Sequence, residues 1–127
     1  MRRVEVIDTT LRDGVQAPGV WLSGARRVEL AGLLASLGVD EIEAGTPAMG
    51  EEERGVIAGV LGLGLEPGCR VTGWCRADEG DLDAASSCGL SSVHVSVPSS
   101  ERQLRAFGKD WGWVERTLVR VLRVARG

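Results

Sequence analysis

A short segment near the N-terminus brings together three side chains with distinct chemistry. Residues 8–16 read Asp-Thr-Thr-Leu-Arg-Asp-Gly-Val-Gln and directly follow the apolar run Val-Glu-Val-Ile at residues 4–7. The Asp13 carboxylate is a hard oxygen ligand for a divalent cation. The Arg12 guanidinium could stabilise charge that develops on a ketone oxygen under attack, and the Gln16 carboxamide could bind a substrate carboxylate or orient Arg12. Taken alone, Asp-Gly is also a common turn.

The strands and helices that position this segment are predicted to alternate regularly along the chain. Short β-branched runs alternate with longer segments of helical period, which is typical of repeated βα units and a parallel sheet. Ser23 is expected to be the N-cap of the first helix, and Gly38 is expected to follow its C-terminus. Four units are predicted, each a strand followed by a helix: Val4–Asp8 with Gly24–Leu37, Glu41–Ala44 with Glu51–Leu61, Arg70–Cys75 with Glu79–Cys88, and Ser92–Val97 with Trp113–Ala125.

Four units make half of a closed barrel. A complete (β/α)8 TIM barrel takes about 250 residues, or roughly 31 per unit, whereas this chain has 127 and stops where a fifth strand would begin. The sequence therefore predicts one incomplete α/β domain, residues 1–127, that resembles the N-terminal half of a TIM barrel. Open strand edges and an uncovered inner face favour association. We expect either a complementary half-barrel chain or self-association of two copies, rather than a stable monomer.

Composition argues against several classes of partner. A net charge of -3 disfavours nucleic acid and anionic membranes, and the basic residues at 116–126 have spacings that suit the solvated face of a helix. Since we find neither a signal peptide nor a membrane-spanning run, we expect a cytoplasmic protein. The three cysteines lack paired zinc-site spacing and are expected to be buried thiols.

Further sequence blocks extend the first segment in a consistent order. Residues 17–20 read Ala-Pro-Gly-Val, 41–52 Glu-Ile-Glu-Ala-Gly-Thr-Pro-Ala-Met-Gly-Glu-Glu, 74–77 Trp-Cys-Arg-Ala, and 93–98 Val-His-Val-Ser-Val-Pro. With residues 8–16, they resemble the signature of the metal-dependent Claisen condensation and lyase family on TIM barrels, which contains homocitrate synthase, 2-isopropylmalate synthase and 3-hydroxy-3-methylglutaryl-CoA lyase. The Gly-Thr-Pro-Ala-Met-Gly and Trp-Cys-Arg-Ala blocks most resemble the homocitrate synthases associated with nitrogen fixation.

The resemblance implies roles for individual residues. Asp13 would be a metal ligand, Arg12 the electrophilic catalyst and Gln16 an active-site polar contact. Glu43 would contact the oxo acid or the metal-bound network, although a salt bridge at the barrel end is the alternative. As loop neighbours, Arg12 and Asp13 need not pair with each other.

The fourth strand adds two candidates. Period-two alternation places His94, Ser96 and Pro98 on one face and three valines on the other. Because valines suit the helix-covered outside, His94 and Ser96 are expected to face the pocket and contact substrate. A satisfied structural histidine is the alternative for His94. Arg76 is a further candidate.

The implied reaction is condensation of acetyl-CoA with a 2-oxo acid, 2-oxoglutarate, to give homocitrate, assisted by a divalent metal (Mg, Mn or Zn). Two departures bear on it. Val15 stands where the condensing enzymes usually carry glutamate, and the family's His-x-His metal ligands are missing, since His94 is the one histidine. The resemblance also implies that the acetyl-CoA and base regions come largely from the missing half.

The metal site is therefore expected to be incomplete, and the chain to be inactive alone. Two alternatives remain open. One is a non-catalytic half-barrel remnant or assembly subunit, and the other is a fragment that resembles 2-isopropylmalate synthase or a lyase.

Overall fold

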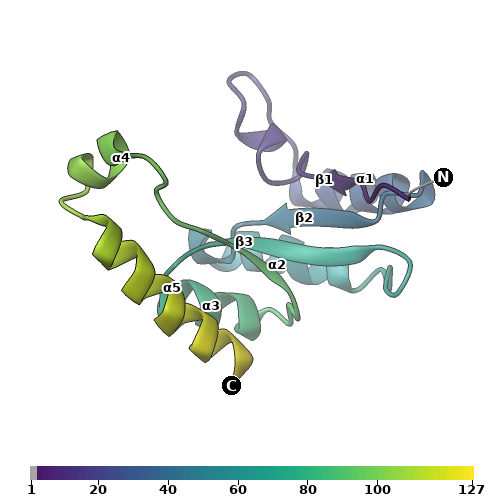
Figure 1. The fold of residues 1–127 in the computed structure, drawn as a ribbon. Helices are drawn as coiled ribbons and strands as arrows, with labels where there is room; N and C mark the ends of the chain where they lie inside the picture. The colour runs from purple at the N-terminus through teal and green to yellow at the C-terminus, as the bar shows by residue number, and fades with distance from the viewer. Residues whose placement is uncertain (1–2) are drawn as a thin grey trace.

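A computed structural model describes residues 3–127 of the chain. Its four strands are all parallel and lie in the order β1-β2-β3-β4, each joined to the next through helices (Figure 1). This arrangement confirms the predicted (βα)4 half-barrel. The elements are β1 Ile7–Asp8, η1 Gly14–Gln16, α1 Gly24–Ser36, β2 Glu41–Gly45, η2 Pro47–Met49, α2 Glu51–Leu61, β3 Arg70–Arg76, α3 Glu79–Ser87, β4 Val93–Ser96, α4 Glu101–Ala106 and α5 Trp111–Arg126.

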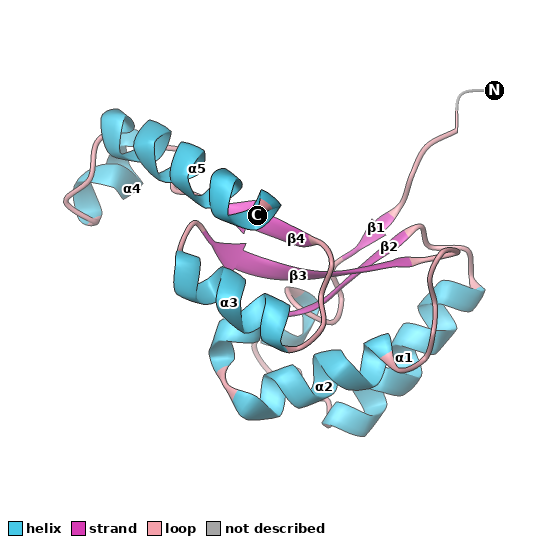
Figure 2. Ribbon diagram, turned by 90° about the horizontal axis from the view of Figure 1, so that it is seen from below, coloured by secondary structure: helices cyan, strands magenta, loops and turns pink. Residues whose placement is uncertain are grey.

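The sheet is curved, and α1, α2, α3 and α5 lie around its convex side (Figures 1 and 2). A first core cluster joins β2 and β3 to α1 and α2 through apolar residues such as Ile42, Val71, Ala31 and Ile57. A second, smaller cluster places Val121 of α5 against the valines of β4. No described helix covers the concave face (Figures 1 and 2), but part of this face is buried by its own side chains, since Glu43 and Thr72 are 1% and 0% exposed.

The helices begin where local hydrogen bonding predicts. The Ser23 hydroxyl accepts a hydrogen bond from the backbone N–H of Arg26, which confirms Ser23 as the cap of α1. Gly38 has a φ of 85°, the left-handed conformation expected just after a helix C-terminus. Asp110 caps α5 through the N–H of Trp113, so this helix begins two residues earlier than the hydrophobic pattern predicted.

The first predicted strand is wrong in length. The sequence predicted Val4–Asp8, but β1 contains two residues and Val4 is largely exposed. Within residues 3–127, β2 is the one strand that pairs with it. The Asp40 carboxylate also accepts a hydrogen bond from the N–H of Val6 at 2.9 Å, where a longer ladder would place a backbone carbonyl. An edge strand with one partner has no second set of backbone bonds to extend it.

Helix α4 is absent from the sequence prediction. Ser100 accepts from the N–H of Gln103 and begins this single short helix, in which Leu104 is the one buried residue. Six residues with one apolar anchor are too few for helical periodicity to show. No helix in the described part of the chain is both long and apolar enough to cross a membrane.

The cysteines behave as small apolar residues. Cys69 and Cys75 are buried and Cys88 is half-buried, and none of the three forms a disulfide. Burial raises the pKa of Cys75 to about 11. A thiol with a raised pKa holds little thiolate at neutral pH. The prediction of buried thiols is confirmed for Cys69 and Cys75.

Candidate active site

Alternate residues of the middle strands face the open side of the sheet. Glu43 is paired in register with Thr72, and Trp74 is paired with His94, so these side chains share the concave face. The valines of β4 pack outward against α5, which confirms the predicted two-faced character of this strand. His94 and Ser96 therefore point to the concave side, as the alternation predicted.

The loop after β1 holds Arg12 over this face. The Thr9 carbonyl accepts hydrogen bonds from the N–H groups of Arg12, Asp13 and Gly14 at 3.1, 2.8 and 3.2 Å. Leu11, which lies between Thr10 and Arg12 in the chain, is fully buried in the first core cluster. The loop is thus a tight turn anchored by one apolar side chain, which leaves its two neighbours, Thr10 and Arg12, free to project elsewhere.

Arg12 lies at the centre of an ionic arrangement. Its Nε donates to Oε2 of Glu43 at 2.6 Å, and its Nη1 donates to Oδ1 of Asp13 at 3.0 Å. The guanidinium carbon is 5.6 Å from the ring centroid of Trp74, within cation–π range. Arg12 and Asp13 therefore do pair, which the sequence left open. Among the described residues, Nη2 of Arg12 has no hydrogen-bond partner and remains available to a ligand.

Glu43 and His94 form the floor of the site. The Glu43 side chain is 1% exposed and shares its second oxygen with Nδ1 of His94 at 2.7 Å. Nε2 of His94 lies 2.5 Å from Oε1 of Glu41. These contacts match the structural alternatives for both residues, namely a salt bridge for Glu43 and a partnered ring for His94. They also place both groups directly beneath Arg12.

The sequence did not single out Glu41, which lies two residues before Glu43 on the same face. Arg70 donates to Oε2 of Glu41 at 2.7 Å, and the hydroxyl of Thr72 donates to Oε1 at 3.2 Å. Burial acts to raise the pKa of Glu41, but the hydrogen bond from Arg70 and the attraction of His94 outweigh it, so the pKa lies below its usual value. The period-two spacing from Glu43 is the signal that could have found it.

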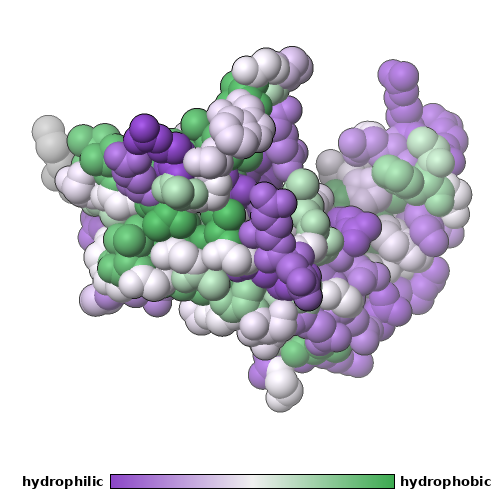
Figure 3. Space-filling view, turned by 180° about the vertical axis from the view of Figure 1, so that it is seen from behind, coloured by the Kyte–Doolittle hydropathy of each residue, from purple (hydrophilic) through white to green (hydrophobic). Residues whose placement is uncertain are grey.

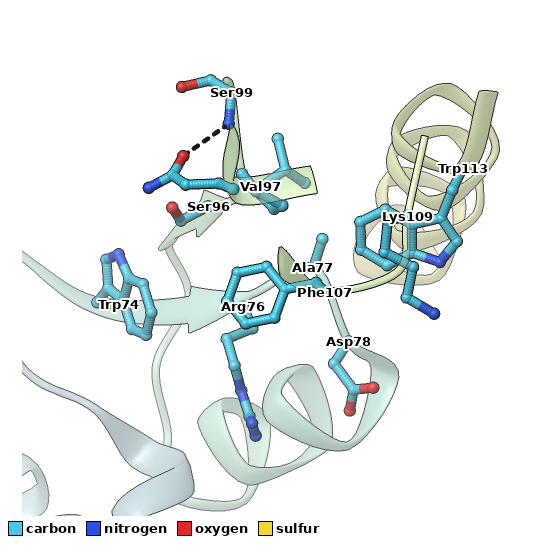
Figure 4. Close-up of a pocket in the computed structure, with 12 residues that line it drawn as sticks. Trp74, Arg76, Ala77, Asp78, Ser96, Val97, Ser99, Phe107, Lys109 and Trp113 are labelled. Carbon is cyan, nitrogen blue, oxygen red and sulfur yellow. Dashed lines mark hydrogen bonds between the residues drawn. The ribbon is translucent and has the colours of Figure 1, made fainter. Parts of the chain in front are cut away.

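An open cavity of about 750 Å³ adjoins this arrangement at the carboxyl ends of β3 and β4. Trp74 stands between the two regions, since one face meets Arg12 and the ring also lines the cavity. Ser96, Phe107 and Trp113 line it too (Figure 4). The sequence therefore correctly placed Ser96 beside a pocket.

Arg76 and Gln16 are less engaged with Arg12. Arg76 lines the cavity but makes two hydrogen bonds to the Asp81 carboxylate of α3, at 3.0 and 2.7 Å. The same side-chain contact holds the pKa of Asp81 below its ordinary value, although burial opposes it. Gln16 ends η1, and among residues 3–127 its carboxamide has no hydrogen-bond partner. The structure thus brings Arg12, Asp13, Glu43 and His94 together through their side chains, whereas Gln16 contacts this group through its backbone N–H, which donates to the carbonyl of Asp13 at 3.1 Å.

A nearly buried ion pair between α1 and α2 anchors the loop that follows β1. Nη1 of Arg27 in α1 donates to Oε2 of Glu53 in α2 at 2.6 Å, while its Nη2 donates to the carbonyls of Leu11 and Ala44, both at 3.0 Å. A Cβ on Gly45 would lie 2.2 Å from Oε1 of Glu53, so only glycine leaves room for this pair. Arg27 therefore ties the residue before Arg12 to the end of β2.

The described residues do not make a cation site by themselves. No group of three or more His, Cys, Asp or Glu side chains between residues 3 and 127 is placed to hold a metal ion. Asp13 is 70% exposed but already contacts Arg12, and Glu43 is shared between Arg12 and His94. One exposed carboxylate is fewer protein ligands than a firm divalent site needs.

We expect acid to destabilise the fold. For Glu53, burial acts to raise the pKa, but the hydrogen bonds from Arg27 and from the N–H of Thr46 outweigh it, and the pKa is lowered. The pKa values of Glu41 and Asp81 are lowered as well, by their arginine partners Arg70 and Arg76. A carboxylate whose pKa is lower in the folded chain stabilises it fully above the unfolded value of about 4, and this contribution is lost as the pH falls through the folded-state values.

Urea denaturation at a series of pH values between neutrality and about pH 3 measures this effect. The free energy of unfolding should stay nearly constant down to about pH 5 and then decrease. A free energy that rises on acidification would show that these carboxylates are not held by their arginine partners.

The fold and the site define a class of protein: one half of an α/β barrel that carries an Arg-Asp loop after its first strand, at the end of the sheet where such barrels place their active sites. A family model described as HMGL-like matches residues 3–127. The chain belongs to this family, which confirms the resemblance found in its motifs.

The similar proteins are synthases. Homocitrate synthase of Frankia alni is 45% identical over 111 residues, which cover 87% of this chain and 31% of that protein. Homocitrate synthase subunit alpha of Clostridium pasteurianum is 38% identical over 120 residues, 94% of this chain and 44% of that subunit. For 2-isopropylmalate synthase 2 of Caldanaerobacter subterraneus subsp. tengcongensis the identity is 32% over 124 residues, 97% of this chain and 32% of the relative. The chain thus spans less than half the length of each.

Proposed function

We propose that this chain supplies the Arg12 side of the active site of a homocitrate synthase-like acyltransferase. The observation that carries the proposal is the placement of Arg12, which is held by Glu43 and Asp13 at the mouth of the half-barrel and keeps Nη2 free. Two of its relatives are named homocitrate synthases. These names support acetyl-CoA and 2-oxoglutarate as the proposed substrates. The cavity beside Trp74 gives room for a small organic acid next to the guanidinium.

In the proposed reaction, a base from outside this chain removes a proton from the methyl group of acetyl-CoA. The resulting enolate carbon forms a bond to the keto carbon of 2-oxoglutarate, and the keto oxygen becomes an alkoxide that is then protonated. Water hydrolyses the thioester and releases homocitrate and CoA. Nη2 of Arg12 donates to the keto oxygen as its charge develops. Gln16 and Ser96 are the proposed contacts to the carboxylates of the oxo acid, and Glu43 orients Arg12. Both nitrogens of His94 face Glu41 and Glu43, so His94 would meet the oxo acid with the exposed part of its ring.

We propose a complementary half-barrel chain as the partner that completes the site. The outer edges of β1 and β4 are unpaired in the described sheet. A second exposed surface lies on the outer side of the half-barrel, away from these edges, where hydrophobic side chains gather over α1 and α2 when the molecule is seen from behind (Figure 3). Leu33 and Leu37 of α1 are 55% and 80% exposed. Such patches mark association surfaces. One relative that this chain matches is itself named as a subunit.

We propose that Asp13 is one ligand of a divalent cation (Mg²⁺, Mn²⁺ or Zn²⁺) whose other ligands come from the complementary half. Isothermal calorimetry of the chain with 2-oxoglutarate and Mn²⁺ tests this part of the site. We expect Asp13→Asn to weaken binding at least about tenfold, because it removes the exposed carboxylate charge. Asp83→Asn, an exposed carboxylate on α3, is the matched control and should bind as the unaltered chain does.

Unchanged binding in Asp13→Asn would contradict the ligand role. Mixing the chain with a candidate complementary half and following CoA release with a thiol reagent tests the whole proposal. Release by the chain alone at ordinary enzyme rates would contradict the need for a partner.

A non-catalytic assembly subunit is the second candidate, and the lack of a three-ligand cluster within residues 3–127 favours it. A reconstituted complex whose CoA release does not depend on Arg12 would support this reading. Competition among 2-oxo acids in the same assay would separate homocitrate synthesis from isopropylmalate synthesis, since both kinds of relative match the chain.

A further inference from the structure

The carboxylate of Glu41 makes a contact that the proposed reaction does not use. It is 3% exposed and lies two residues before Glu43 on β2, farther from the carboxyl end of the strand. Its Oε1 lies 2.5 Å from Nε2 of His94. Glu43 contacts the other ring nitrogen, so both nitrogens face a carboxylate oxygen, and both contacts hold the ring when each nitrogen carries a proton. A ring held at one nitrogen can swing about that bond, whereas a ring held at two cannot.

Glu41 is itself held in one orientation. Arg70 donates from Nε to Oε2 at 2.7 Å, and Thr72 donates its hydroxyl to Oε1 at 3.2 Å. Thr72 is fully buried, and the Arg70 side chain is half exposed at the edge of the cluster. These donors leave Oε1 aimed at His94 from the neighbouring strands.

We propose that Glu41 is a positioning residue that fixes the imidazole of His94, and through it Glu43, beneath Arg12. The chain of contacts runs from Arg70 through Glu41, His94 and Glu43 to Arg12, with each link between 2.5 and 2.7 Å. Glu43 meets both His94 and Arg12 with separate oxygens, so the ring orientation sets the angle at which Glu43 receives the guanidinium. The importance of this angle for catalysis rests on the proposed function, whereas the positioning of His94 by Glu41 does not.

The test uses the imidazole as its own probe. The chain holds a single histidine, so ring signals in a long-range ¹H–¹⁵N NMR spectrum need no assignment. In the unaltered chain we expect one set of ring signals and an Nε2 proton that exchanges slowly with water. Glu41→Leu should accelerate that exchange at least about tenfold, because the buried acceptor is gone. Glu52→Leu, which replaces an exposed glutamate on α2, is the control and should leave the signals unchanged.

Arg70→Gln provides a second route if Glu41→Leu does not fold. It removes the Nε donor from Glu41 while keeping the carboxylate, and the half-exposed side chain can be replaced without opening the core. We expect exchange about threefold faster, since Glu41 then keeps its contacts to Thr72 and His94 but loses the arginine that orients Oε2. Ring signals unchanged in a folded Glu41→Leu, or in Arg70→Gln, would overturn the proposal, even if the melting temperature falls.

Adding 2-oxoglutarate and Mg²⁺ to the unaltered chain separates this proposal from the proposed function. A shift of the His94 signals on addition would support a substrate-facing ring. No shift on addition, with the exchange results as expected, would count against the substrate role of His94 and leave the positioning role of Glu41 in place.

Discussion

Glu53→Ala is expected to lower the free energy of unfolding by about 3–5 kcal/mol, because it leaves the buried Arg27 guanidinium without its counter-ion. Arg27 is 8% exposed, and Glu53 accepts from both of its terminal nitrogens, at 2.6 and 2.9 Å. The same carboxylate accepts from the N–H of Thr46 at 3.0 Å, so the backbone after β2 loses a partner as well. Urea unfolding followed by circular dichroism measures the change.

Glu52→Ala is the matched control, since Glu52 is the preceding residue of α2 and is exposed. Its effect should stay within about 0.5 kcal/mol. The double variant Arg27→Met with Glu53→Leu should recover much of the lost stability, because replacing both members of a buried pair leaves no unpaired charge. A loss below about 1 kcal/mol in Glu53→Ala would show that water reaches the guanidinium and that the pair does not anchor the loop.

The sequence predicted the parts of this site that depend on local pattern. The order of strands and helices follows from alternating periodicities, and the outward valines of β4 placed His94 and Ser96 on the inner face before any contact was known. Arg12 and Asp13 could be located because they directly follow a strand in a fold whose chemistry gathers at strand carboxyl ends. These inferences need only spacing along the chain.

What the sequence missed depends on contacts between distant residues. Arg27 and Glu53 are 26 positions apart, and in the sequence each looks like an ordinary exposed residue of a helix. The period-two spacing from Glu43 places Glu41 on the inner face, but Arg70, which donates to it, is 29 positions away, so local pattern does not reveal its hydrogen-bond partners. Their roles follow from register between β2 and β3 and from packing of α1 on α2, which no single segment specifies.

Arg12→Ala is expected to reduce kcat of the reconstituted enzyme by about 10²–10³, because it removes a positioned donor to the oxygen on which charge develops. Arg12→Lys keeps the charge beside Glu43 but replaces the planar fork with a single ammonium. It should therefore keep most of the stability and still lose about tenfold or more in kcat. CoA release under saturating substrates measures both variants.

Two results separate catalysis from folding. Arg26→Ala, which removes a largely exposed arginine of α1, should leave kcat unchanged. Arg12→Ala also leaves the buried Glu43 with His94 as its remaining side-chain partner, so its unfolding curve must be measured beside its rate. A fall in kcat in Arg12→Lys without a matching fall in stability would assign the effect to guanidinium geometry. Full activity in Arg12→Ala would remove Arg12 from the reaction and favour an assembly role for the half-barrel.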